Sequence, residues 1–146
     1  MRYYEEISAG ETFECGSKTV SRDEIIRFAE QYDPQPFHVD EEHARQTMFG
    51  GLIASGLHTL SICNGLATDG AYENLAILGG YGIDELRFHE PVYPGDCLSV
   101  TVEVSQKHGI DRQLDRGDVD FRVSGFVEDG SEKISWTALA MMKPNS

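Results

Sequence analysis

A carboxylate and an imidazole lie five residues apart on a short segment that contains two prolines: Asp33 and His38 enclose the sequence Pro-Gln-Pro-Phe. When two such groups face one small site they can hold a water molecule, and one accepts its proton while the other delivers a proton elsewhere. The same spacing also fits a structural role, in which Asp33 caps a turn and His38 lies on a surface loop. General acid–base chemistry is therefore one of two hypotheses for this segment.

A second candidate is the run of small residues Ala-Ser-Gly at 54–56, where an apolar helix is expected to begin. The first N–H groups of a helix are unpaired and carry partial positive charge. If they pointed at a thioester carbonyl, they would stabilise a developing enolate. Gly56 has no Cβ and would let a ligand approach the backbone. The residues alone equally allow Ser55 to be only an N-cap and Gly56 only a packing glycine.

Other kinds of site find less support. His38, Asp40 and His43 contain metal-binding groups, but no fourth ligand stands at a familiar spacing, and Asp40 is explained as a helix cap. The chain lacks a glycine-rich phosphate loop and a GxSxG motif. Its three cysteines are odd in number and widely separated, which is typical of reduced thiols in a cytoplasmic protein.

The composition indicates a single domain, residues 1–146, that acts on small molecules. Acidic residues outnumber Lys and Arg by 25 to 12, so the net charge is −13. A phosphate backbone or an anionic membrane surface requires a basic face, and we therefore expect neither nucleic acid nor membrane as a partner. No apolar run reaches the roughly 20 residues that span a bilayer.

Three helices are expected to position the candidate groups. The first begins at the capping box 21–24 and ends at Asp33-Pro34, because a residue before proline avoids the helical region. A short second helix begins at the acidic turn 40–42. The third spans about Gly56 to Ala67, is apolar on more than one side, and is therefore expected to be buried. Its apolar stripe consists of Leu57, Leu60, Cys63 and Ala67.

From about residue 81 the hydrophobic period changes from that of a helix to that of strands. Strands are expected at 82–88, 98–104, 119–123 and 134–142, with a bulge at 125–126 and a hairpin turn at 128–131. Together with an extended N-terminal piece, this order predicts an α+β fold in which an antiparallel sheet wraps around a central helix. Such a sheet leaves an open edge that a second copy of the chain can cover.

Two long segments carry a family resemblance. Residues 28–29 (Phe-Ala), 32–40 (Tyr-Asp-Pro-Gln-Pro-Phe-His-Val-Asp) and 49–59 (Phe-Gly-Gly-Leu-Ile-Ala-Ser-Gly-Leu-His-Thr) resemble the MaoC-like dehydratases, or (R)-specific enoyl-CoA hydratases. Residues 82–88 and 91–96 are similar to that family as well. The resemblance implies the hot-dog fold with an inserted helical overhang, and a homodimer or higher homo-oligomer.

The resemblance also implies the chemistry. Asp33 and His38 would be the catalytic pair, and the Gly56 N–H would form the oxyanion hole. The reaction would be reversible hydration of a trans-2-enoyl-CoA to the (3R)-3-hydroxyacyl-CoA, without a metal or organic cofactor. The chain departs from the family's usual Asn at position 35 and from its frequent His at position 55. The residues expected to bind the substrate are Gln35, Phe37, Leu52, Ile53 and Ser55.

Two other functions fit the same fold. A lone carboxylate on the central helix would favour an acyl-CoA thioesterase. However, the first acidic residue after Gly56 is Asp69, at the far end of that helix. A non-catalytic acyl-CoA binding protein would be favoured by loss of either polar group, and both are present. Loss of enoyl absorbance without release of thiol distinguishes a hydratase from both.

Overall fold

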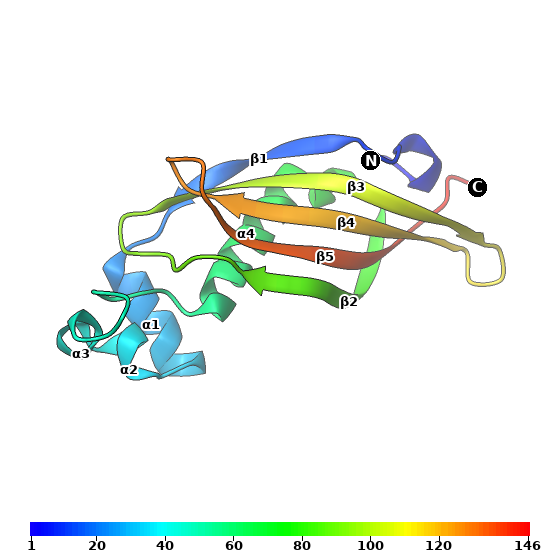
Figure 1. Cartoon of the computed structure of the whole chain (residues 1–146). Helices are drawn as coiled ribbons and strands as arrows, with labels where there is room; N and C mark the ends of the chain where they lie inside the picture. Colours follow the sequence, from blue (N-terminus) through cyan, green and yellow to red (C-terminus); the bar gives the residue numbers. More distant parts are fainter.

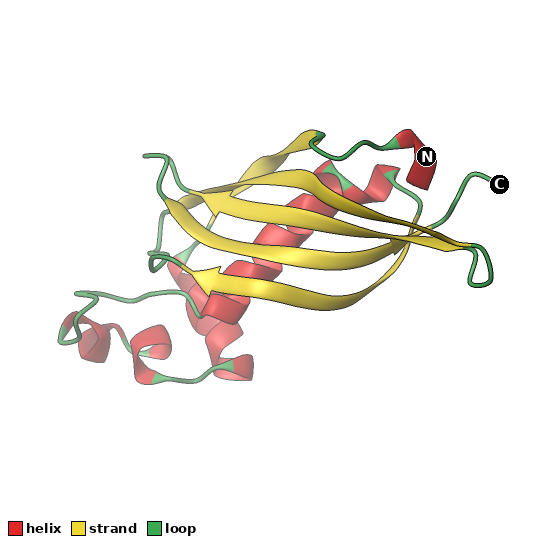
Figure 2. Ribbon diagram, turned by 45° about the vertical axis from the view of Figure 1, so that its right-hand side comes forward, coloured by secondary structure: helices red, strands yellow, loops and turns green.

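A computed structural model describes all residues, 1–146. Five antiparallel strands form one sheet in the order β1-β3-β4-β5-β2 (Figure 1). Helix α4 (Gly56–Gly70) crosses one face of this curved sheet (Figure 2). The predicted α+β architecture, the hot-dog arrangement of a sheet wrapped around a central helix, is therefore confirmed. The strands are β1 (Thr12–Thr19), β2 (Ile77–Phe88), β3 (Cys97–Asp111), β4 (Arg116–Phe126) and β5 (Glu132–Met142).

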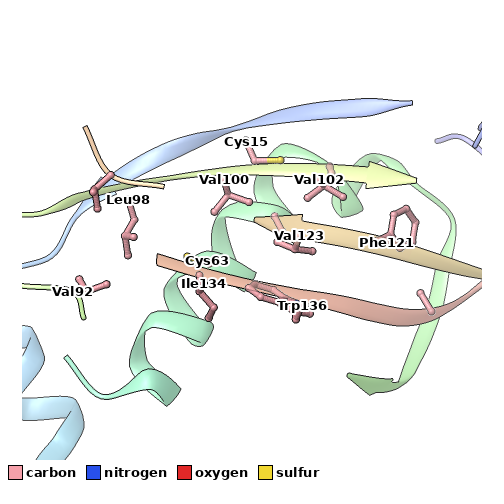
Figure 3. Close-up of a cluster of buried hydrophobic side chains, with 14 of the residues drawn as sticks. Cys15, Cys63, Val92, Leu98, Val100, Val102, Phe121, Val123, Ile134 and Trp136 are labelled. Carbon is pink, nitrogen blue, oxygen red and sulfur yellow. The ribbon is translucent and has the colours of Figure 1, made fainter. Parts of the chain in front are cut away.

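The core lies between α4 and the concave face of the sheet. Cys63 of α4 packs among strand side chains that alternate in and out of the core, such as Val100, Val123 and Trp136 (Figure 3). The expected apolar stripe of α4 is partly wrong, because Leu57 is 48% exposed. The buried side chains of the helix are His58, Thr59, Cys63 and Ala67.

The turns and the bulge follow the sequence closely. The register of β4 against β5 shifts between Gly125 and Phe126, as predicted. A Cβ on Gly125 would lie 2.8 Å from the sulfur of Cys63, so glycine at the bulge lets α4 approach the sheet. The strands β2 and β3 are longer than expected, because β2 already begins at Ile77 and β3 continues past its alternating residues to Asp111.

Three helices form an overhang, residues 22–45, at one end of the sheet (Figure 1). They are α1 (Arg22–Tyr32), α2 (Pro36–Val39) and α3 (Glu41–Arg45). The Ser21 hydroxyl caps α1, and the Asp40 carboxylate caps α3, as predicted. Helix α2 was not expected. Pro36 occupies its first position, where a missing N–H costs nothing and the fixed φ favours a helical turn.

The β2 edge carries several apolar side chains that the rest of the chain covers only in part. Leu78, Tyr81, Ile83 and Phe88 are each about half exposed. An edge strand also presents unpaired backbone groups, and such edges are commonly covered by another chain. None of the helices combines the length and apolar character that crossing a bilayer requires.

Candidate active site

Asp33 and His38 face each other across the junction between α1 and α2. Asp33 is the C-cap of α1, and its backbone N–H donates to the carbonyl of Ala29 at 2.8 Å. The chain then turns through the two prolines into α2, whose third residue is His38. This turn brings Asp33 Oδ2 to 3.4 Å from His38 Nε2. The structure thus brings together the two groups that the sequence singled out for acid–base chemistry.

Two neutral side chains hold the Asp33 carboxylate. The Ser55 hydroxyl donates to Oδ2 at 2.7 Å, and the Gln35 amide donates to Oδ1 at 2.8 Å. These two hydrogen bonds, first that from Ser55, lower the pKa of Asp33 below its ordinary value because they favour the charged form. Asp33 is therefore an oriented and ionised carboxylate at neutral pH.

The backbone fixes the tautomer of His38. Its Nδ1 lies 2.7 Å from the carbonyl oxygen of Ile53, and a carbonyl can only accept, so Nδ1 carries the hydrogen. In the neutral ring, Nε2 then holds a lone pair directed towards Asp33. Phe37 packs edge-on against the ring with centroids 4.5 Å apart, and His38 is buried. Two acceptors thus face each other, an arrangement that a water molecule satisfies by donating to both.

Helix α4 begins beside this pair. Ser55 is its N-cap, and its hydroxyl accepts from the N–H of Leu57 at 3.2 Å. Gly56 is the first helical residue, so its N–H has no partner within the helix. A Cβ on Gly56 would lie 2.6 Å from the ring of Phe88. The close approach that requires glycine here is therefore made by the Phe88 ring.

A cavity of about 350 Å³ lies beside His38 and Gly56, and Asp33 is not among the residues that line it. Small-molecule sites in proteins have roughly 300–1,000 Å³, so this cavity is at the lower end of the range. Its wall contains His38 and Gly56 together with apolar side chains of the segment between α3 and α4 and of the end of β2 and the segment that follows it. The lining residues are His38, Phe49, Ile53, Ala54, Gly56, Thr59, Phe88, His89, Glu90, Pro91, Val92 and Lys133.

The five expected substrate-binding residues have different positions. Only Ile53 lines the cavity. Gln35 and Ser55 bind the Asp33 carboxylate instead, and Ser55 is fully buried. Phe37 packs on His38, and Leu52 belongs to the hydrophobic core. Four of the five are therefore not among the residues that line the cavity.

Sequence reasoning missed the far wall of the cavity. Phe88 is the last residue of β2, His89 and Glu90 follow it, and Lys133 lies at the start of β5. The backbone N–H of His89 donates to the carbonyl of Lys133 at 2.8 Å, which joins the two segments. These residues are more than thirty positions from Gly56 in the chain, and no local motif marks them. The only available signal was a lysine within a strand whose other side chains are mostly uncharged.

The possible metal ligands do not converge. No three histidine, cysteine, aspartate or glutamate side chains form a group that could hold a metal ion. Asp40 accepts from the backbone N–H groups of Glu42 and His43, which accounts for its carboxylate.

Comparison with known proteins places this geometry in a family. The profile of the MaoC like domain matches residues 6–124. An uncharacterized protein of Bacillus subtilis, YdeM, is 42% identical over 103 residues, which are 70% of this chain and 73% of that protein. An (R)-specific enoyl-CoA hydratase of Rhodospirillum rubrum is 31% identical over 106 residues, 72% of this chain and 71% of that protein. The crystal structure of a MaoC-like dehydratase from the same bacterium superposes with a TM-score of 0.91 at 34% identity, covering 100% of this chain and 99% of that one.

Proposed function

The chain belongs to the MaoC-like domain family, and from this we propose that it catalyses the reversible hydration of a trans-2-enoyl-CoA to the (3R)-3-hydroxyacyl-CoA. Family membership supports acyl-CoA hydration or dehydration in general. The observation that carries the specific proposal is the pair of opposed acceptors, Asp33 Oδ2 and His38 Nε2, beside the start of α4. Such a pair binds and activates one water molecule next to a set of unpaired N–H groups.

In the hydration direction, the water oxygen forms a bond to C3 of the enoyl group. One water proton passes to the Asp33–His38 pair, and the electrons of the double bond move onto the thioester oxygen as an enolate. The same pair then returns a proton to C2, so that H and OH add to one face. Because the two groups share one water, their protonation belongs to the pair as a unit.

The start of α4 supports the charge that develops on the thioester oxygen. The Gly56 N–H and the positive end of the helix dipole stabilise an enolate more than a neutral carbonyl, which is the requirement for catalysis. The Ser55 side chain links the two parts of this machinery, because it caps α4 and also holds Asp33. In this proposal Asp33, His38 and Gly56 are catalytic, and Ser55 and Gln35 position Asp33.

We also propose that the chain acts as a homodimer or higher homo-oligomer. The apolar β2 edge and its unpaired backbone groups support this, because a second copy would cover both. Light scattering during size exclusion tests the proposal, and a monomer at micromolar concentration would contradict it. The cytoplasmic location remains a prediction from the cysteine content.

The activity is tested with crotonyl-CoA and octenoyl-CoA, following the absorbance of the enoyl thioester and the free thiol in parallel. We expect absorbance loss without thiol release, and a chiral separation should show the (3R) product. Release of thiol would instead make the protein a thioesterase. Binding of both thioesters without either change would leave a non-catalytic acyl-CoA binding protein.

A further inference from the structure

A buried cation lies in the same cavity as His38 and Gly56. Lys133 is only 9% exposed, and lysine is almost never buried to this extent without a specific partner. Its ammonium lies 3.2 Å from Oε2 of Glu90, which also lines the cavity. An ammonium has three donors, and this contact uses one of them. The proposed hydration of an unsubstituted enoyl chain does not involve the Lys133 ammonium.

Glu90 is an exchangeable partner. Its side chain is 52% exposed, so it can turn into solvent at little cost, since ion pairs with a solvated member contribute little. Its carboxylate also demonstrates that a carboxylate fits against Lys133 in this cavity. The imidazole of His89 lies on the same wall, but its Nε2 already contacts the Ser135 hydroxyl oxygen at 2.7 Å and the Glu132 carboxylate at 3.0 Å. Lys133 is therefore the cation that the cavity offers to a ligand.

We propose that Lys133 binds a carboxylate at the end of the acyl chain, in the place that Glu90 occupies in the free protein. This inference rests on the proposed function and narrows its substrate class to 2-enoyl thioesters of dicarboxylic acids. Exchange of one carboxylate for another keeps the cavity's charge balanced, whereas a neutral chain end would leave the buried ammonium with Glu90 alone. The enoyl group would also occupy this cavity of about 350 Å³, and the space that is left fits a short diacid chain.

The phosphates of CoA are the competing source of an anion. They lie at the nucleotide end of CoA, separated from the thioester by the pantetheine arm, whereas the terminal carboxylate of a short diacid lies only a few bonds from the reacting double bond. The two sources predict different behaviour, since a carboxylate on the acyl chain remains when CoA is replaced by pantetheine, whereas the phosphates of the nucleotide do not.

The test compares two substrates of the same shape. Glutaconyl-CoA carries a terminal carboxylate, and trans-5-methylhex-2-enoyl-CoA carries an isopropyl group of similar size in its place. We expect kcat/KM to favour glutaconyl-CoA, and Lys133→Met to reduce this preference by roughly 10- to 100-fold, the range for one charge-assisted contact. Lys133→Arg should restore part of it. Lys143→Met, an exposed lysine outside the cavity, is the matched control and should leave the preference unchanged.

Glu90→Gln distinguishes ligand binding from a purely structural ion pair. It removes the internal competitor, so kcat/KM for glutaconyl-CoA should rise several-fold, opposite in sign to the effect of Lys133→Met. If the Lys133–Glu90 ion pair were only structural, Lys133→Met and Glu90→Gln would both lower kcat/KM, and to the same extent for both substrates. The proposal is also wrong if the effect of Lys133→Met disappears with the pantetheine thioesters. Hydration of the isopropyl substrate without any preference for glutaconyl-CoA would overturn this inference alone, whereas no hydration of either would overturn the proposed function with it.

Discussion

The hydroxyl of Ser55 donates to Oδ2 of Asp33 at 2.7 Å, although the two residues are 22 positions apart in the chain. The Ser55 hydroxyl oxygen also accepts from the N–H of Leu57 in the first turn of α4. One buried serine therefore fixes the carboxylate relative to the helix start at which Gly56 lies.

Removal of either acid–base group should abolish most of the activity. We expect Asp33→Asn and His38→Ala each to lower kcat by at least ~100-fold, a typical contribution of general acid–base catalysis. His43→Ala is the matched control, because His43 is an exposed histidine on the neighbouring helix α3, and its activity should match the unmodified protein. Circular dichroism checks folding. Activity near that of the unmodified protein in either variant of the pair would disprove the mechanism.

Ser55→Ala should change the pH dependence as well as the rate. Loss of the main hydrogen bond that lowers the pKa of Asp33 lets that pKa rise towards its ordinary value of 3.8. Asp33 must be ionised to hold the water, so the acid limb of the profile of kcat/KM against pH should move to higher pH. Ser61→Ala, on the exposed face of the same helix, should leave the limb in place. An unshifted limb in Ser55→Ala would mean that the serine only caps α4.

Two glycines of α4 should respond differently to alanine. In Gly56→Ala the new Cβ meets the Phe88 ring at 2.6 Å, and that half-exposed ring can move, so activity should fall while stability changes little. In Gly70→Ala the Cβ meets the backbone of Cys15 at the same distance, which cannot move as easily. We expect Gly70→Ala to lower the free energy of unfolding by about 1–3 kcal/mol. Urea unfolding measures the free energy of unfolding of both variants. An equal loss of stability in Gly56→Ala and Gly70→Ala would contradict this explanation.

His58 should make stability depend on pH. It stacks on Phe28 with ring centroids 4.6 Å apart, and burial lowers its pKa below the ordinary 6.5. The unfolded chain therefore binds a proton more readily than the folded one, so the stabilisation is complete above pH 6.5 and is lost as pH falls below it. The nearby charges of Glu24 and Lys18 act on the pKa in opposite directions. In His58→Leu the urea midpoint should fall less between pH 7 and pH 5, and an unchanged slope would assign the effect to other groups.

Features set by neighbouring residues could be predicted from the sequence. The caps at Ser21, Asp40 and Ser55 depend on a hydroxyl or carboxylate two or three residues before the N–H it binds. Those at Ser21 and Asp40 form as expected, and that at Ser55 is one of the two roles that the residues allowed. The opposed Asp33 and His38 followed from their spacing and the family resemblance. Periodicity could not show that Leu57 is exposed, because the helix is apolar on more than one side and only its contacts with distant segments decide which side is buried.

Features that depend on distant segments could not be predicted. Lys133 reaches the cavity because β5 begins beside the end of β2, and this pairing has no signature near either residue. The expectation that Ser55 and Gln35 touch the substrate was reasonable for polar residues beside a catalytic pair. In the structure the Ser55 hydroxyl and the Gln35 amide both donate to the Asp33 carboxylate. The sequence does not show whether such donors bind a neighbouring carboxylate or a ligand.

Residues 33–54 are joined to the rest of the molecule by few hydrogen bonds. Besides the Ser55–Asp33 bond, these are the Asp33 N–H to the Ala29 carbonyl at 2.8 Å, the Ala54 N–H to the Val92 carbonyl at 2.9 Å, the Tyr93 hydroxyl to the Phe49 carbonyl at 2.9 Å, and the contact of Arg22 with Glu41. A small number of bonds implies that residues 33–54 can open locally with much less free energy than the sheet needs to unfold. Catalysis should then fail at a denaturant concentration where the amide protons of β3 and β4 still resist exchange. The sheet thus confers durability, while catalytic competence depends on the less stable of the molecule's two parts.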